Sequence, residues 1–183
     1  MHPKEQFTWF LEVFPALIGF VILAFTYKTF PLTPLLYSLI LFHSIVLMIG
    51  GHYTYAEVPL FDWLKQTFDL SRNNYDKLGH FTQGFVPAII AREIFVRKNI
   101  INGIWWRRYL IVSVCLAFSA FYELIEWWVA VASGDDSVAF LGTQGYVWDT
   151  QSDMAWALTG SIIALIVLHK LHDKQIKTLQ AHE

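Results

Sequence analysis

The sequence predicts an all-α, polytopic membrane helix bundle with about five transmembrane helices and one short interfacial helix. Of the 183 residues, 55% are hydrophobic and only 15% are charged, which is less charge than a soluble domain usually carries. Five separate apolar runs approach the length needed to cross a bilayer. The chain also has eight Trp, eight Tyr and fifteen Phe residues, a number typical of aromatic belts at two membrane interfaces.

The five predicted spans show no internal repeat and no low-complexity tract, so we expect a single integral membrane domain over residues 1–183. We expect the first run to be retained and not cleaved, because residues 1–6 lack the basic region and small-residue site of a signal peptide. The approximate bounds of the spans are 10–27, 35–49, 78–96, 109–131 and 154–171.

The segment between the second and third spans is expected to contain a short helix at about 59–69. It begins at Pro59, a residue that fits the first turn of a helix. Apolar side chains follow at three- and four-residue spacing: Leu60, Phe61, Leu64 and Phe68. This pattern indicates a helix lying in the outer interface, with Trp63 at headgroup level. A re-entrant segment is the alternative.

The charges between the spans predict an N-terminus outside and a C-terminus in the cytoplasm. Basic residues crowd the link between the third and fourth spans and follow the fifth: Arg97, Lys98, Arg107, Arg108, Lys170, Lys174 and Lys177. The link 132–153 has no Lys or Arg and carries Asp135, Asp136, Asp149 and Asp153. The positive-inside rule places the basic links in the cytoplasm. It is weakest before the third span, where three basic residues lie on the predicted outer side: Lys65, Arg72 and Lys77.

This topology brings seven titratable side chains to the outer end of the bundle: His52, Asp76, His80, Glu123, Glu126, Asp149 and Asp153. Asp76 and His80 are four residues apart at the start of a span and therefore share a helix face. Glu123 follows Arg108 by fifteen residues, which is roughly 22 Å along a helix. Ionisable groups near hydrocarbon are costly, so their convergence indicates a functional site.

Each member of this set also has a purely structural interpretation. Asp76, Asp149 and Asp153 stand at predicted helix N-termini, where carboxylates cap free amides and complement the helix dipole. Glu126 can extend toward the interface, and His52 can be an interfacial ring. The co-location of all seven groups favours the functional interpretation.

A histidine with several carboxylates is a suitable ligand set for zinc, manganese or iron. We therefore predict a divalent metal held by His80, Asp76 and Asp153. Glu123 and Asp149 are the predicted catalytic residues, and Glu123 is also an alternative metal ligand. Two further residues are expected to bind substrate or to support the ligands: His52 and Glu126.

The run at 76–81, Asp-Lys-Leu-Gly-His-Phe, resembles the start of a span in the VanZ-like membrane proteins. Glu123 and Asp153 match a glutamate in the next span and an aspartate in the last span of that family. The resemblance implies the bacterial envelope and an association with resistance to cell-wall glycopeptides.

A fuller set of motifs resembles the YjdF-type bacterial inner-membrane proteins, a family of unknown function. The matching motifs cover about 50–160 and are Gly-His-Tyr-Thr-Tyr at 51–55, Asn-Tyr-Asp-Lys-Leu-Gly-His at 74–80, Glu-Leu-Ile-Glu-Trp at 123–127 and Trp-Asp-Thr-Gln-Ser-Asp-Met at 148–154. This resemblance implies a multi-pass protein of the bacterial cytoplasmic (inner) membrane.

Three classes of function are compatible with these residues. The first is metal-dependent hydrolysis or transfer on a membrane lipid or a lipid-linked envelope precursor. The second is a proton relay or a non-enzymatic binder of lipid headgroups, of the glycopeptide-resistance type. The third is a polar cluster that only holds the spans together. A net charge of −2 argues against nucleic acid, and the single cysteine, Cys115, excludes an intramolecular disulfide and a cysteine-based zinc site.

Overall fold

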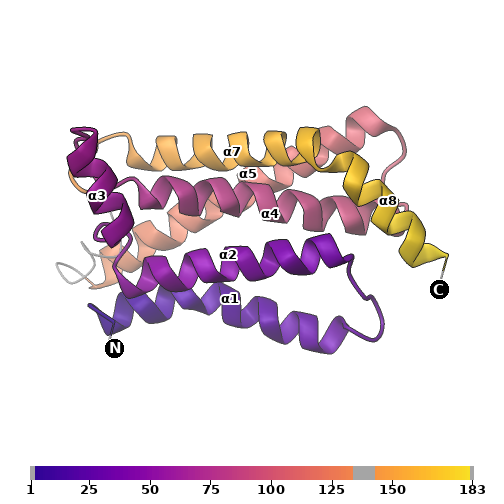
Figure 1. Cartoon of the computed structure of the whole chain (residues 1–183), viewed down its shortest axis with the longest axis horizontal. Coiled ribbons are helices and arrows are strands. Elements are labelled where there is room, and N and C mark those ends of the chain that lie inside the picture. Colours follow the sequence, from indigo (N-terminus) through magenta and orange to yellow (C-terminus); the bar gives the residue numbers. More distant parts are fainter. Residues whose placement is uncertain (1–2, 134–142, 182–183) are drawn as a thin grey trace.

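The computed structural model describes residues 3–133 and 143–181, which form a bundle of helices (Figure 1). The helices are α1 (Gln6–Thr26), α2 (Pro34–His52), α3 (Pro59–Thr67), α4 (Tyr75–Arg97), α5 (Ile104–Ser133), α7 (Asp149–Val167) and α8 (His169–Gln180). The long helices α1, α2, α4, α5 and α7 run along the longest axis of the molecule. The predicted helical membrane bundle is therefore confirmed. Two charges used in the topology prediction, Asp135 and Asp136, lie outside the described residues.

The two ends of this bundle differ. The N-terminus, α3 and the first residues of α4 and α7 lie at one end, which we call the α3 end (Figure 1). The C-terminus and α8 lie at the other, the α8 end. Helix α3 lies across its end of the bundle, as predicted for an interfacial helix, and its Leu60 and Trp63 side chains are exposed.

Three of the described helices are long and apolar enough to cross a membrane alone: α1, α2 and α5. A fourth candidate is α7 together with α8, which are joined at a bend of 64°. The predicted span 154–171 therefore begins too late and continues past the bend. The sequence becomes polar after Leu168, and α8 is amphipathic, with His172 and Ile176 buried, so this segment turns aside from the direction of α7.

Helix α4 is long enough to span, since its 23 residues extend roughly 35 Å. Because α4 carries many polar side chains, it is not among the helices that are apolar enough to cross a membrane alone. It lies centrally and contacts α2, α5 and α7. Because these neighbours shield α4 from lipid, it can carry ionisable groups that a lipid-facing helix cannot. The predicted third span is thus the polar interior helix of the bundle.

Close packing between α4 and α7 depends on two glycines. A Cβ atom at Gly84 would lie 1.8 Å from the carbonyl oxygen of Ala157. A Cβ atom at Gly160 would lie 2.1 Å from the carbonyl oxygen of Phe81. Small residues that let two backbones approach are the usual device of helix packing in membranes. This seam fixes the middle of α4 against the middle of α7.

An apolar core joins the first turn of α2, the second half of α4, the first half of α5 and the last turn of α7, so it lies nearer the α8 end. Its fully buried members include Leu36, Ile89, Ile111 and Cys115. Cys115 is thus a buried packing residue, as its apolar surroundings in the sequence suggest. The buried members of this core bring no acidic, basic or histidine side chain to the α3 end.

Candidate functional site

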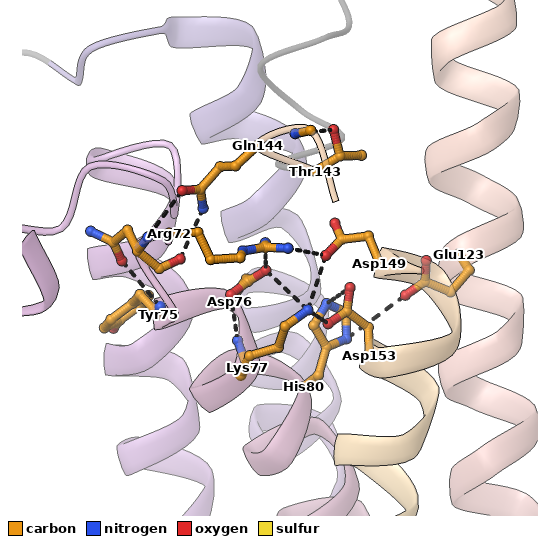
Figure 2. Close-up of polar contacts among 12 residues, drawn as sticks. Arg72, Tyr75, Asp76, Lys77, His80, Glu123, Thr143, Gln144, Asp149 and Asp153 are labelled. Carbon is orange, nitrogen blue, oxygen red and sulfur yellow. Dashed lines mark hydrogen bonds and ion pairs between the residues drawn. The ribbon is translucent and has the colours of Figure 1, made fainter. Parts of the chain in front are cut away.

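Arg72 and Lys77 bind three aspartates at the α3 end (Figure 2). Arg72 donates to Asp149 Oδ1 at 2.5 Å and also to Asp76 Oδ2. Lys77 Nζ donates to Asp149 Oδ1 at 2.9 Å and to Asp153 Oδ1 at 2.7 Å. All five side chains are at most 10% exposed. Their charges therefore interact across protein and not across bulk water.

His80 lies beside this network, between carboxylates from two other helices (Figure 2). Its Nε2 atom is 3.7 Å from Asp153 Oδ2 on α7. Its Nδ1 atom is 3.9 Å from Glu123 Oε1 on α5 and 2.9 Å from Gln83 Oε1 one turn further along α4. Glu123 Oε1 is buried and has no hydrogen-bond partner among the described residues. His80 therefore faces two carboxylate oxygens, one of which is otherwise unsatisfied.

The negative charge at this end exceeds the positive charge. Among the described residues around His80, two permanently charged bases, Arg72 and Lys77, face six buried carboxyl groups: Glu12, Asp76, Glu123, Glu126, Asp149 and Asp153. Burying unpaired negative charge is costly. The surplus must therefore be offset by bound cations or by protons on some of the carboxyl groups.

A cavity of about 100 Å³ connects this network with α1 and α2. Its walls include His80 and Asp153 on one side and Glu12 and Glu126 on another. A buried water needs roughly 10–15 Å³ measured in this way, so the cavity has room for several waters or for one ion with waters. The polar groups of the site thus border space that side chains do not fill.

Glu12 joins the site through hydrogen bonds with two tyrosines. The hydroxyl of Tyr122 on α5 donates to Glu12 Oε2 at 3.0 Å. Tyr55 also hydrogen-bonds with Glu12. Burial, followed by the nearby Glu12 carboxyl, raises the pKa of Tyr55 well above its usual value, so its hydroxyl stays protonated. Helix α1 is thereby tied to the polar interior by a carboxyl group.

Tyr55 reaches this position because two glycines make room for its ring. A Cβ atom at Gly79 on α4 would lie 2.9 Å from the Tyr55 ring, and one at Gly50 on α2 would lie 2.3 Å from it. Thr54 and Tyr55 have positive φ angles of 56° and 55°. Such a conformation is uncommon for residues other than glycine and is found more often at functional sites.

A separate set of hydrogen bonds, made by the neighbouring Asn73, positions Arg72. The neighbouring Asn73 amide donates to Gln144 Oε1 at 3.0 Å, and Gln144 Nε2 donates back to the Asn73 carbonyl at 2.9 Å. Asn73 Nδ2 donates to Val58 O at 3.1 Å and to Asp62 Oδ1 at 2.8 Å. Asn73 therefore links α3, the start of α4 and the segment before α7, which holds Arg72 above its aspartates.

The structure brings six of the seven predicted site residues together. His80 approaches Glu123 and Asp153, and the remaining three line the cavity beside them: Asp76, Glu126 and Asp149. His52 is the exception, because its ring packs against Tyr53 at 4.6 Å between centroids and it is absent from the cavity wall. The predicted border role of His52 therefore has no support in this geometry.

The aspartates have stronger partners than the capping interpretation predicts. Asp76 Oδ1 does accept the Lys77 amide at 2.8 Å, but its other oxygen is bound by Arg72. Asp149 lies in the first turn of α7 and accepts from both Arg72 and Lys77. Asp153 lies a full turn inside the helix, where no free amide remains to be capped.

Several contributors to the site were missed or undervalued in the sequence. Arg72 and Lys77 stand out only as exceptions to the positive-inside rule, although their spacing from Asp76 places them on or beside its helical turn. Glu12 is a lone acidic residue in an apolar run, which was a usable signal. Tyr55 and Gln83 show no pattern from which their roles could be recognised.

Among residues 3–133 and 143–181, two groups of three side chains are close enough to hold a metal ion: His80–Glu123–Asp153 and Asp76–Asp149–Asp153. Within each group, one ligand atom from each residue lies within 4.8 Å of the others. The second group is already bound by Arg72 and Lys77, which supply the positive charge that an ion would. In the first group, Glu123 Oε1 and Asp153 Oδ2 face His80 and form no ion pair with Lys77.

Comparison with known proteins now places the chain. A family model described as "Predicted membrane protein (DUF2238)" matches residues 1–174. The chain belongs to this family. It is also 51% identical over 173 residues to the inner membrane protein YjdF of Escherichia coli (strain K12), an alignment covering 94% of this chain and 83% of that protein. No solved structure matches the chain.

The family assignment confirms the YjdF-like resemblance seen in the sequence motifs. The inner-membrane relative and the apolar helices α1, α2 and α5 together support a multi-pass location in the inner membrane. The VanZ-like resemblance stays a prediction, as do the metal and the orientation of the termini.

Proposed function

We propose that the α3 end binds a divalent cation through His80, Glu123 and Asp153, and that the protein uses it to hydrolyse or transfer a group on a lipid or lipid-linked envelope precursor. The observation that carries this proposal is the position of His80 between Asp153 Oδ2, at 3.7 Å, and the unpartnered Glu123 Oε1, at 3.9 Å. Ligand atoms about 2.1 Å from a tetrahedral ion lie roughly 3.4 Å from one another. One ligand atom from each of the three residues already lies within 4.8 Å of the others, so small side-chain rotations would bring them to that separation.

Gln83 supports the nitrogen that an ion would use. Because Gln83 Oε1 accepts from His80 Nδ1 at 2.9 Å, the neutral ring keeps its lone pair on Nε2. Nε2 is the atom that faces Asp153. Metal-binding histidines usually donate their other ring N–H to an oxygen in this way.

The charge balance also supports a cation at this position. Lys77 already neutralises one oxygen of Asp153, yet Glu123 and the other oxygen of Asp153 still face the ring with no positive charge between them. A divalent ion would supply that charge. Three protein ligands would leave a coordination position open for water or substrate, as in catalytic sites.

Asp76 and Asp149 take a different part in this proposal from the one that the sequence suggests. Both are bound by Arg72, and Asp149 also accepts from Lys77. We assign them to holding these two bases in place and not to metal binding or catalysis. Glu123 becomes a ligand, and Glu126 lines the cavity through which water or substrate would arrive.

A bound divalent cation would make a nucleophile from water at neutral pH or polarise a phosphoryl or carbonyl oxygen. His80, Glu123 and Asp153 would orient it, and the buried Arg72–Lys77 network would keep their arrangement rigid. The site lies at the α3 end of the bundle, where α4 and α7 begin. A substrate carried by the bilayer is therefore the class that can reach it without leaving the membrane.

Incubation of the purified protein with total inner-membrane lipid, followed by lipid mass spectrometry, tests this function. We expect a product that forms with manganese or zinc present and disappears after chelation. The Glu123→Gln variant should form none, whereas the matched variant Glu57→Gln, at an exposed position, should act like the native protein. Turnover that persists with chelator would exclude a metal-dependent reaction.

A proton relay is the second candidate, because the cavity continues the acidic site toward α1. It is lined by Glu126, Glu12 and Tyr122 beyond His80, so titratable groups follow one another from α4 to α1. Vesicles containing the protein and a trapped pH dye would detect proton movement. Proton flux abolished by Glu12→Gln, in protein that binds no metal, would favour this candidate over the enzyme.

A further inference from the structure

The α8 end has a second polar cavity that the proposed cation site does not use. Its volume is about 110 Å³, and its polar walls are Arg92, Arg107, Arg108 and His169, with Asp173 as the acidic member; the remaining walls are apolar. It lies among α4, α5, α7 and the first turns of α8. No residue lines both this cavity and the one at the α3 end, and two of its walls, Ile111 and Leu165, belong to the apolar core.

One of these arginines is held rigidly. Arg92 donates to Asp173 Oδ1 at 2.6 Å and lies 2.9 Å from His172 Nδ1. His172 is fully buried, and its Nε2 atom lies 2.9 Å from Glu93 Oε2, which is also fully buried. This chain of contacts fixes the guanidinium of Arg92 at the wall of the cavity. Asp173 is thereby committed to Arg92.

The other two arginines keep their charge available. Neither Arg107 nor Arg108 has a side-chain ion pair with any residue in the ranges 3–133 and 143–181. The Arg108 guanidinium lies 5.4 Å from the centre of the Trp105 ring, a contact that leaves its N–H groups free to donate elsewhere. The cavity therefore has a surplus of positive charge.

An open apolar groove of about 570 Å³ adjoins this cavity and shares Arg108, Leu165 and His169 with it. The groove lies between α5 and α7, and its other walls are apolar or aromatic: Trp105, Tyr109, Val112, Ile162 and Ile166. Tyr109 and Ile166 are more than 60% exposed, so the groove opens toward the lipid. In a bilayer the natural occupant of such a groove is an acyl chain.

We propose that this paired cavity and groove bind one anionic phospholipid. Its phosphate accepts hydrogen bonds from Arg107 and Arg108, and an acyl chain lies along the groove past Val112 and Ile162. Arginine suits this role because its planar N–H groups match phosphate oxygens, and basic pockets between membrane helices are known to hold anionic headgroups. The site follows from charge and shape alone and does not depend on which leaflet the α8 end occupies.

Native mass spectrometry of the detergent-purified protein tests this site. We expect dioleoylphosphatidylglycerol to bind roughly tenfold more tightly than dioleoylphosphatidylcholine, because only the first has a net negative headgroup. The Arg107→Gln/Arg108→Gln variant should lose this preference. The matched variant Lys174→Gln/Lys177→Gln removes the same charge from exposed positions of α8 and should keep it. Equal binding of the two lipids by the native protein would overturn the proposal.

The acyl-chain half of the site needs its own test. The Val112→Phe variant narrows the groove without changing any charge, so we expect it to weaken phosphatidylglycerol binding by several-fold while the preference over phosphatidylcholine remains. Excess inorganic phosphate should displace little lipid. Displacement by phosphate, with no effect of Val112→Phe, would identify a free-phosphate site and refute lipid binding. This readout also serves if the arginine variant does not fold.

Discussion

Lys77 is the residue on which most of the acidic cluster depends. Its Nζ atom bonds Asp149 and Asp153 and lies 3.5 Å from Asp76. Removing one member of a buried ion pair leaves the other uncompensated, which costs more than the pair itself contributes. The aspartates at the α3 end are thus tolerated because Lys77 and Arg72 are there.

Replacing Lys77 by methionine should therefore destabilise the bundle by about 3–5 kcal/mol, because three buried carboxylates lose a common partner. The measurement is the thermal unfolding midpoint of detergent-purified protein. Lys174→Met, at an exposed position of α8, is the control and should have little effect. Equal midpoints for the two variants would show that Lys77 is not required for charge balance.

Replacing Gln83 tests the site while leaving all three proposed ligands in place. Gln83→Leu takes away the acceptor that holds His80 Nδ1 and should weaken divalent-cation affinity by roughly 10–100-fold. Titration calorimetry with manganese or zinc gives the affinity. Gln151→Leu, an exposed position on α7, should leave it unchanged. Unaltered affinity in Gln83→Leu would mean that Gln83 does not orient the ring.

At the scale of the helices, the seam between α4 and α7 determines whether the site forms. Gly84 and Gly160 let the two backbones meet, and this contact places His80 on α4 beside Asp153 on α7. Helices separated by ordinary side chains lie 8–10 Å apart or more, which would part these groups. The glycine seam is thus as necessary to the site as the ionisable residues.

Gly84→Ala should destabilise the protein by about 1–3 kcal/mol, because the added methyl group overlaps the Ala157 carbonyl. Gly19→Ala is a matched control: it is also a helical glycine, but no neighbouring atom lies within 4 Å of its Cβ position. That substitution should be neutral or slightly stabilising, since alanine favours helix. The measurement is the thermal unfolding midpoint of the two variants. Similar midpoints would contradict the proposal that close α4–α7 packing requires a glycine at position 84.

The polar site was more predictable than the contacts that build it. Ionisable residues in apolar surroundings are conspicuous, and helical spacing and span order placed His80, Glu123 and Asp153 at one depth. The Arg72 and Lys77 ion pairs could not be predicted, because a basic residue near a span end is usually solvated. Gly84 carries no side-chain pattern at all. Its role depends on a facing backbone that only the tertiary structure supplies.

The bend between α7 and α8 was likewise difficult to predict from the sequence alone. An apolar run predicts where a span can lie, but the change from Val167 to the polar α8 is gradual in sequence, and the bound 171 was too late. For α4 the apolar signal in the sequence is weak, because its interior position lets it carry more polar residues than a span usually does.

For the whole molecule, the structure removes an apparent conflict in the charge distribution. Arg72 and Lys77, which weakened the positive-inside argument, are neutralised by buried aspartates. The α8 end keeps Arg107, Arg108 and the exposed lysines of α8. We propose that the α3 end faces the outside and the α8 end faces the cytoplasm.

Cysteine labelling tests this orientation well, since Cys115 is the single native cysteine and can be replaced by serine. In that background, Gln66→Cys, at an exposed position of α3, should react with an impermeant maleimide in cells with a permeabilised outer membrane. Asn102→Cys, between α4 and α5, should react only after the inner membrane is opened. The reverse pattern would invert the proposed topology.

The central claim is that His80, Glu123 and Asp153 hold a divalent cation at the α3 end. Elemental analysis of protein purified without chelator and without a metal-affinity resin tests it most directly. We expect about one zinc, manganese or iron ion per chain, lost in His80→Ala but kept in His52→Ala, whose ring lies away from the cavity. No bound metal in the native protein, even after supplementation, or a full complement in His80→Ala, would contradict it.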